Sequence, residues 1–186
     1  MYWRSILSRS ALTVQEFANY TLWNRRGLLT LAAAGLIGFC AAATARADET
    51  LKFRQFMHAT SAQSLDVGDV DGHAMSLVRF TGLVSLPDGS VGTAYFTAAT
   101  DYTKGAGPFS VYQNLTLDDG SVLWYKMAGT ATVDGAKTLF VGTITVLGGK
   151  GRFEGAKGEG TVTGTRLNPL VVGAVLYLDC TINIKK

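Results

Sequence analysis

The 186-residue chain has few of the residues that usually form cross-links, metal sites and rigid turns: two cysteines, two histidines and three prolines. Only Cys180 lies outside the leader described below, so the mature chain cannot form an intrachain disulfide and depends on its hydrophobic core. We expect Cys180 to be a small buried core residue. His58 and His73 lack a cysteine or histidine at ligand spacing, which predicts no zinc site. We expect no metal and no cofactor.

The chain also lacks a concentrated charge of one sign once its N-terminal segment is set aside. The whole sequence has 17 Lys and Arg against 14 Asp and Glu, but the first 47 residues hold five arginines and one glutamate. That leaves 12 basic and 13 acidic side chains, which are scattered and form no basic stripe. The basic pI of 8.9 therefore belongs to the precursor, and we expect no nucleic-acid partner.

Residues 1–47 have the pattern of a cleaved export signal. Arg25 and Arg26 precede an uncharged apolar run over 27–43, and Ala45-Arg46-Ala47 matches the small-x-small pattern of a signal-peptidase site. The segment from Asn24 resembles a twin-arginine signal. We therefore expect cleavage after Ala47, a periplasmic or secreted bacterial protein, no stable membrane insertion after cleavage, and one domain over residues 48–186.

The mature chain has no convincing helical period, and its apolar residues alternate along segments that end at glycine, proline or aspartate. Longer loops are expected over 59–73 and 101–108. Strands are predicted over 51–58, 75–86, 90–99, 109–117, 122–133, 138–147, 159–167 and 171–184. Eight strands joined mostly by short turns predict an all-β fold, a single eight-stranded antiparallel up-and-down β-barrel, because closure removes the unpaired edges.

The segments 139–147 and 159–167 flank a glycine-dense connection. Its glycines are expected to provide positive φ angles or close backbone contact, and Phe153 is expected to anchor the hairpin on the core. The turn glycines are Gly148, Gly149, Gly151 and Gly155. A phosphate-binding loop needs a helix after the glycines, and here a Thr/Val alternation follows. The sequence therefore predicts a structural turn.

Aromatic side chains on the strands are the candidates for lining the barrel interior. They are Phe53, Tyr95, Tyr112, Trp124, Tyr125 and Tyr177. Because neighbouring residues of a strand face opposite ways, only one of Trp124 and Tyr125 can point inwards. Core packing and the lining of a ligand pocket both remain open for these residues.

Other polar residues give weaker signals. Asp69-Val70-Asp71-Gly72 lacks the further ligands of a calcium loop, so a solvated turn is expected. His73 either hydrogen-bonds that loop or acts at the barrel mouth. Lys126 and Asp179 lie within strands, where an inward side chain needs a partner and an outward one faces solvent. No serine, cysteine or aspartate lies in a nucleophile motif, so the catalytic residues, if there are any, stay unknown.

The segment 148–158, GGKGRFEGAKG, resembles the G-G-T-G-x-F-x-x-A-x-G hairpin of the allene oxide cyclase-like and dirigent barrel superfamily, with Lys150 in place of threonine. The segment 68–73, GDVDGH, is similar to an earlier landmark of these proteins. The resemblance is strongest to exported bacterial members and implies a calycin-like barrel. It carries over no catalytic residue.

In this superfamily the cyclases close a fatty-acid epoxide, and the dirigent proteins steer the coupling of reactive phenolic intermediates; both hold an apolar molecule in one shape. Plant members commonly form trimers, which implies an apolar outer face, and the dry face of the last predicted strand is compatible with that. A homo-oligomer, trimer or dimer, is a possible partner.

The leading hypothesis is that the barrel binds a small apolar or aromatic ligand non-covalently. One alternative is a cofactor-free isomerase or cyclase of the allene oxide cyclase or dirigent type, and the other is a structural barrel with a filled interior. A cavity lined only by apolar groups favours binding, a cavity with at least one buried, hydrogen-bonded carboxylate or tyrosine favours the isomerase, and the lack of a cavity favours the structural barrel.

Overall fold

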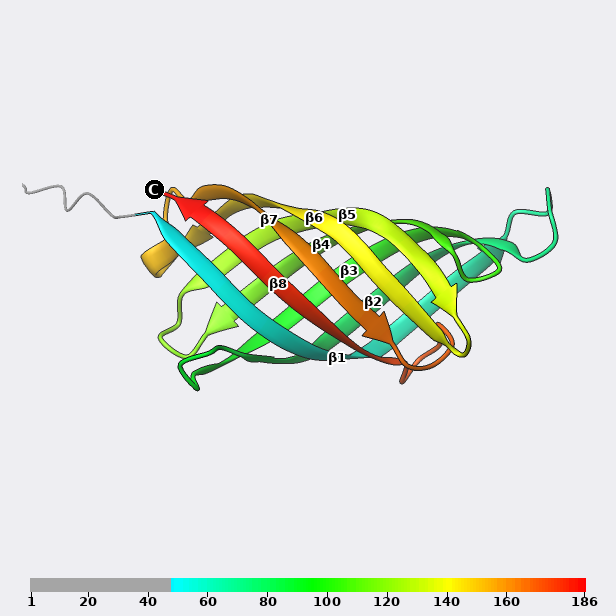
Figure 1. The fold of residues 1–186 in the computed structure, drawn as a ribbon, viewed down its shortest axis with the longest axis horizontal. Coiled ribbons are helices and arrows are strands. Elements are labelled where there is room, and N and C mark those ends of the chain that lie inside the picture. The colour runs from blue at the N-terminus through cyan, green and yellow to red at the C-terminus, as the bar shows by residue number, and fades with distance from the viewer. Residues whose placement is uncertain (1–47) are drawn as a thin grey trace, which may run out of the picture. The chain divides into compact units, whose positions relative to one another are not determined.

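The computed structural model describes residues 48–186, and the predicted leader over 1–47 lies outside the described residues. Each strand pairs antiparallel with its chain neighbours, and β8 pairs back onto β1 to close the barrel (Figure 1). The strands are β1 (Glu49–Asp66), β2 (His73–Ser85), β3 (Val91–Thr103), β4 (Gly107–Leu117), β5 (Val122–Asp134), β6 (Lys137–Lys150), β7 (Lys157–Arg166) and β8 (Val175–Lys185). The predicted eight-stranded up-and-down barrel is confirmed. No helix within residues 48–186 has the length and apolar character to cross a membrane.

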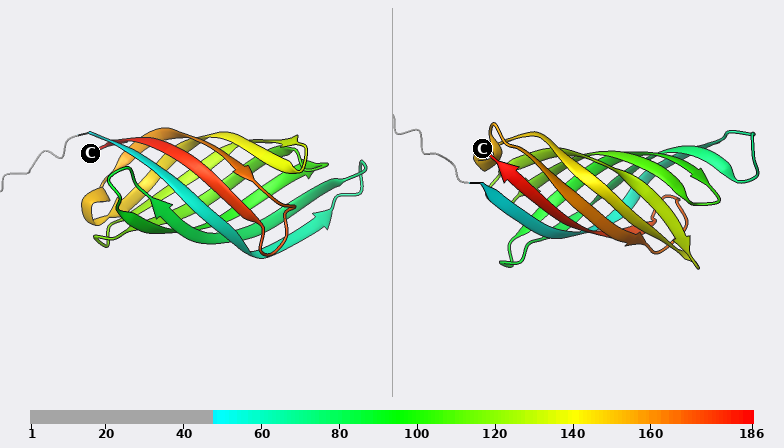
Figure 2. Two further views of the ribbon diagram at one scale, coloured as in Figure 1. Left: turned by 60° about the horizontal axis from the view of Figure 1, so that its bottom comes forward. Right: turned by 45° about the horizontal axis from the view of Figure 1, so that its top comes forward.

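Two predicted loops are in fact mostly strand. β1 continues to Asp66, so the loop predicted over 59–73 shrinks to 67–72. The extension pairs with the start of β2 in a hairpin that projects beyond the barrel (Figures 1 and 2). Its side chains are largely polar and exposed, so no apolar alternation marked it as strand. The loop predicted over 101–108 shrinks to 104–106, because β3 continues to Thr103 and β4 begins at Gly107.

The last strand also differs from its prediction. It begins at Val175, and residues 167–174 form the connection between β7 and β8. The backbone of this connection is tied to β1, because the Gly173 amide donates to the Ala59 carbonyl and the Ala59 amide donates to the Ala174 carbonyl, each over 2.8 Å. The apolar run over 171–174 therefore belongs to an ordered connection at the end of the barrel.

The dry face of β8 points into the barrel. Cys180, Ile182 and Ile184 are each no more than 3% exposed and belong to the core. This face therefore cannot be the apolar outer face that a trimer requires. Cys180 is buried as predicted, and burial raises the pKa of its thiol well above the ordinary value.

The glycine-dense hairpin closes one end of the barrel. A single 3₁₀ turn, η1 (Gly151–Phe153), lies between β6 and β7, and Phe153 is completely buried. Gly151 and Gly155 have φ angles of +64° and +72°. Gly149 serves a different purpose, since a Cβ there would lie 2.4 Å from the Val122 carbonyl oxygen. The predicted structural turn and the burial of Phe153 are confirmed.

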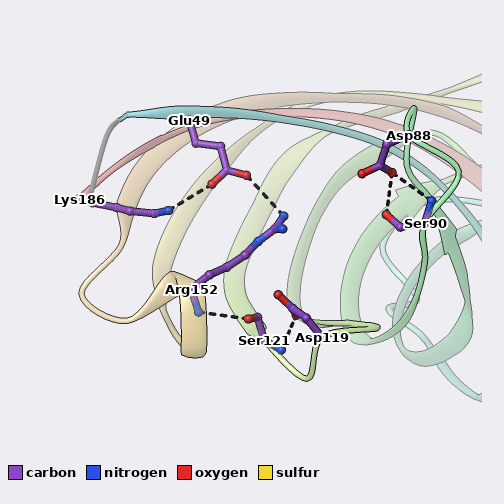
Figure 3. A network of polar contacts seen from close by, with 7 residues as sticks. All are labelled: Glu49, Asp88, Ser90, Asp119, Ser121, Arg152 and Lys186. Atoms are coloured by element: carbon purple, nitrogen blue, oxygen red, sulfur yellow. Dashed lines mark hydrogen bonds and ion pairs between the residues drawn. The ribbon is translucent and has the colours of Figure 1, made fainter. Parts of the chain in front are cut away.

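Polar contacts join this hairpin to the start of β1 and to Lys186, which follows β8 (Figure 3). The carboxylate of Glu49, at the start of β1, accepts from Arg152 Nη2 over 3.4 Å and from Lys186 Nζ over 3.1 Å. The Arg152 amide donates to Ser121 Oγ over 3.1 Å. The end of the barrel where β1 begins and β8 ends is therefore covered by Phe153 and stabilised by these contacts.

Two substitutions in the hairpin separate the two uses of glycine. Gly149→Ala must displace the Val122 carbonyl and the Phe153 Cβ, which would lie 2.5 Å from the new methyl group, and should cost about 3 kcal/mol of unfolding free energy. Gly155→Ala meets no atom within 4 Å and should cost only the about 1 kcal/mol of a positive φ. Urea unfolding of both variants measures the difference, and equal losses would contradict the close-approach role of Gly149.

Candidate functional site

A narrow cavity of about 40 Å³ lies inside the barrel towards the end opposite Phe153. Every strand except β1 contributes to its wall, together with Leu170 of the connection 167–174. Twelve of its fifteen lining side chains are apolar. They are Val78, Phe80, Phe96, Ala98, Phe109, Val111, Met127, Phe140, Val162, Leu170, Leu176 and Leu178. Sites for drug-sized ligands occupy roughly 300–1,000 Å³, so a guest here must be slender or must displace lining side chains.

The position of the cavity follows from the sizes of the inward side chains. The middle of the barrel is filled by large groups such as Phe53, Met57 and Tyr125, and the rings of Phe53 and Tyr125 lie 6.3 Å apart. Towards the other end of the barrel the inward positions include Val78 on β2 and Ala98 on β3, whose short side chains do not reach across. Interiors otherwise pack densely, so the remaining space collects at this end.

Three polar side chains complete the wall: Thr100 and Tyr102 on β3 and Arg166 at the end of β7. Arg166 is only 4% exposed. Its Nε donates to the Asn168 carbonyl oxygen and its Nη2 donates to Thr138 Oγ1, both over 2.9 Å. The guanidinium is therefore held at the cavity wall by two neutral acceptors.

Burial changes the acid–base properties of this polar group of residues. It lowers the pKa of Arg166 and raises the pKa of Tyr102 to about 12, although the nearby Arg166 charge acts in the opposite direction on the tyrosine. The Thr100 hydroxyl is buried and has no hydrogen-bond partner among the described residues. At neutral pH the wall thus offers a protonated phenol, a hydroxyl and a cation.

The chemistry of this wall suits binding better than proton abstraction. Among the described residues no Asp, Glu or His side chain lines the cavity, so no ordinary general base faces it. Tyr102 can donate a hydrogen bond and Arg166 can stabilise negative charge on an oxygen atom. The site can therefore hold and orient an oxygen-bearing guest.

A second buried polar cluster lies between the cavity and the closed end. The side-chain amides of Gln55 and Gln113 pair reciprocally, with Gln55 Nε2 donating over 3.3 Å and Gln113 Nε2 donating over 2.5 Å. Tyr125, also fully buried, has no partner for its hydroxyl within residues 48–186. The inward alternation of Gln55 with Phe53 and Met57 was the sequence signal for this pair. These residues do not line the cavity, so they belong to the core.

None of the six aromatic residues predicted to line a pocket is among the cavity residues. Phe53 and Tyr125 do point inwards, but they pack in the filled middle of the barrel. Tyr95 and Tyr112 lie on the outer face, 41% and 58% exposed. They therefore do not line the interior.

Trp124 and Tyr177 also lie on the outer face, since each directly precedes a buried residue of its strand, Tyr125 and Leu178 respectively. Nζ of Lys150 lies 5.8 Å from the centroid of the Trp124 ring, and the guanidinium carbon of Arg54 lies 5.5 Å from the centroid of the Tyr177 ring. The prediction that Trp124 and Tyr125 face opposite ways is confirmed. The register places these four predicted aromatic residues, Tyr95, Tyr112, Trp124 and Tyr177, on the side away from the cavity.

Lys126 and Asp179 lie on the outer face as well. Asp179 accepts two hydrogen bonds from Arg54, over 2.6 and 2.7 Å, and these bonds lower the pKa of its carboxyl group. Lys126 Nζ lies 5.6 Å from the Tyr112 ring centroid. Neither residue is a candidate acid, base or anchor for the interior.

His73 bridges two carboxylates next to the loop 67–72, at the tip of the projecting hairpin. Its Nδ1 lies 2.5 Å from Asp69 Oδ1 and its Nε2 lies 2.6 Å from Asp101 Oδ1. The predicted hydrogen bond to the loop is confirmed, and His73 does not line the cavity. The carboxylates bind opposite sides of the ring, and residues 48–186 contain no cluster of three or more metal-ligand side chains.

No family model matches the chain, and no curated protein matches it. The conserved protein of unknown function RPA1785 from Rhodopseudomonas palustris is similar in structure, with 11% identity and a TM-score of 0.50, over 74% of this chain and 98% of that one. Two pterocarpan synthase dirigent proteins are also similar. GePTS1 has 12% identity and a TM-score of 0.46 over 75% of this chain and 87% of its own, and PsPTS1 has 13% and 0.44 over 74% and 97%. The predicted resemblance to dirigent-type barrels is confirmed as a likeness of fold.

The His73 bridge predicts a pH-dependent contribution to stability. Hydrogen bonds to Asp101 and then to Asp69 raise the pKa of His73 above 6.5. The contribution is therefore fully present below pH 6.5 and is lost as the pH rises through the raised pKa. Wild type should exceed His73→Gln in unfolding free energy at about pH 5.5, and the excess should shrink towards about pH 9. Urea unfolding across this range measures it, and a constant difference would contradict the bridge.

Proposed function

We propose that this chain is an exported barrel protein that binds a small, slender apolar or aromatic molecule non-covalently in its interior. The observation that carries the proposal is the cavity with twelve apolar lining side chains at the end opposite Phe153. Burial of apolar surface is the main favourable contribution to such binding. The export part of the proposal rests on the sequence of residues 1–47.

A barrel with a completely filled interior is less consistent with the packing. The inward side chains leave space beside Ala98, although they fill the barrel around Tyr125. Leu170 is the one lining residue that lies outside a strand. A shift of Leu170 would therefore enlarge the cavity without breaking a strand ladder. Most guests require such an enlargement, because the cavity volume is only about 40 Å³.

A cofactor-free isomerase or cyclase is the second candidate, and the pair Tyr102 and Arg166 favours it. A protonated phenol and a guanidinium can stabilise an oxyanion as it develops on a bound molecule. The reaction would then depend on the conformation in which the cavity holds its guest. The absence of a carboxylate or imidazole from the described cavity wall makes binding the better supported function.

Filling the cavity tests the binding proposal. Ala98→Leu places a larger side chain in the cavity, whereas Ala99→Leu adds the same atoms at the adjacent exposed position. Ala98→Leu should weaken the binding of a hydrophobic fluorescent dye about tenfold or more, which corresponds to about 1.4 kcal/mol. Ala99→Leu should leave dye binding unchanged.

Dye titrations monitored by fluorescence measure both variants, and thermal unfolding checks that each remains folded, because overpacking can cost about 1–3 kcal/mol. Equal dye affinity in the two folded variants would show that the dye binds elsewhere and would count against an internal site.

A further inference from the structure

Arg166 is a buried cation without an acidic partner in the described part of the chain. The ion pairs found within residues 48–186 involve Arg54, His73, Lys104, Arg152 and Lys186, and none involves Arg166. Each of those cations has a side-chain nitrogen within 4 Å of a carboxylate oxygen. A buried charge is costly unless it is paired, so this position calls for an anion.

The hydrogen bonds of Arg166 leave donors available. A guanidinium carries five N–H donors, and the Asn168 carbonyl and Thr138 Oγ1 accept one each. Both acceptors are neutral, so they fix the position of the group without neutralising its charge. The Arg166 guanidinium carbon also lies 5.8 Å from the centroid of the Phe140 ring, which is itself part of the cavity wall.

Further donors surround the same space. Tyr102 lines the cavity with a phenol that remains protonated at neutral pH, and the Thr100 hydroxyl is buried beside the cavity with no partner among the described residues. Each of these three groups can donate a hydrogen bond to an anionic oxygen. The apolar remainder of the wall offers it nothing comparable, so the polar groups define where the head of a guest would lie.

We propose that Arg166 binds the carboxylate of the guest, so that the ligand class is an apolar chain or ring that carries one carboxylate. This inference rests on the proposed function of the cavity. The planar guanidinium matches a carboxylate in a two-point contact. One positive charge balances one negative charge, which favours a carboxylate over a doubly charged phosphate.

Two probes of equal chain length test the inference directly. Octanoate and 1-octanol differ at the head group, and isothermal titration calorimetry measures the affinity of each. Wild type should bind octanoate about tenfold or more tightly than 1-octanol. Arg166→Gln should lower octanoate affinity about 10- to 100-fold, the range expected for hydrogen bonds to a charged group, and should leave 1-octanol affinity unchanged.

The matched control is Arg79→Gln, which removes the same charge from an exposed position on β2. It should leave both affinities unchanged, and this result separates a local contact from a general effect of net charge. Octyl phosphate serves as a third probe, and tighter binding of it than of octanoate would overturn the choice of carboxylate.

The outcomes distinguish failure of the carboxylate inference from failure of the proposed binding function. Equal binding of octanoate and 1-octanol, with no change in Arg166→Gln, would overturn the carboxylate inference while leaving an apolar site in place. Binding of neither probe to wild type would overturn the proposed function itself. If Arg166→Gln does not fold, the comparison of probes on wild type still decides, because a purely structural arginine gives no preference for octanoate.

Discussion

The structure depends on the closure of the sheet through the pairing of β1 with β8. Ten residue pairs, from Glu49 with Ile184 to His58 with Val175, form this ladder. Because it joins the first strand to the last, the barrel wall has no free edge outside the projecting hairpin, and each side chain of the wall points either inwards or outwards. The filled middle, the cavity and the exposed aromatic residues all follow from this division.

The two ends of the closed barrel differ in structure. At one end the connection between β6 and β7 turns inwards and buries Phe153, and contacts of Glu49 with Arg152 and Lys186 join the start of β1 and the residue after β8 to this connection. At the other end the strands are joined by connections without such a plug. Small inward side chains such as Ala98 and Val78 lie there among larger ones, and the space beside them contributes to the cavity at this end.

The sequence predicted the barrel and the hairpin because both depend on local patterns: alternation, short turns, and the glycines around Phe153. It did not predict which aromatic residues line the cavity. Alternation separates Trp124 from Tyr125 but does not say how deep the inward one lies, and depth depends on pairings with distant strands. The extension of β1 was missed because its polar, exposed residues carry no alternation signal. The burial of Arg166 could have been predicted from alternation, since it lies four residues after the inward Val162 on the same strand. A charged residue at the end of a strand, however, is ordinarily expected to be exposed to solvent.

The position of Arg166 connects the proposed anion contact to the one part of the described cavity wall that lies outside a strand, the connection 167–174. Its Nε holds the Asn168 carbonyl, and two residues later Leu170 covers the cavity. An anion that contacts the guanidinium therefore acts on the segment that limits the cavity volume. The connection is fastened again where Gly173 and Ala174 bond to Ala59, so its movement is confined to the few residues between these attachments. Enlargement of the cavity thus requires only a local rearrangement and leaves the barrel ladder intact.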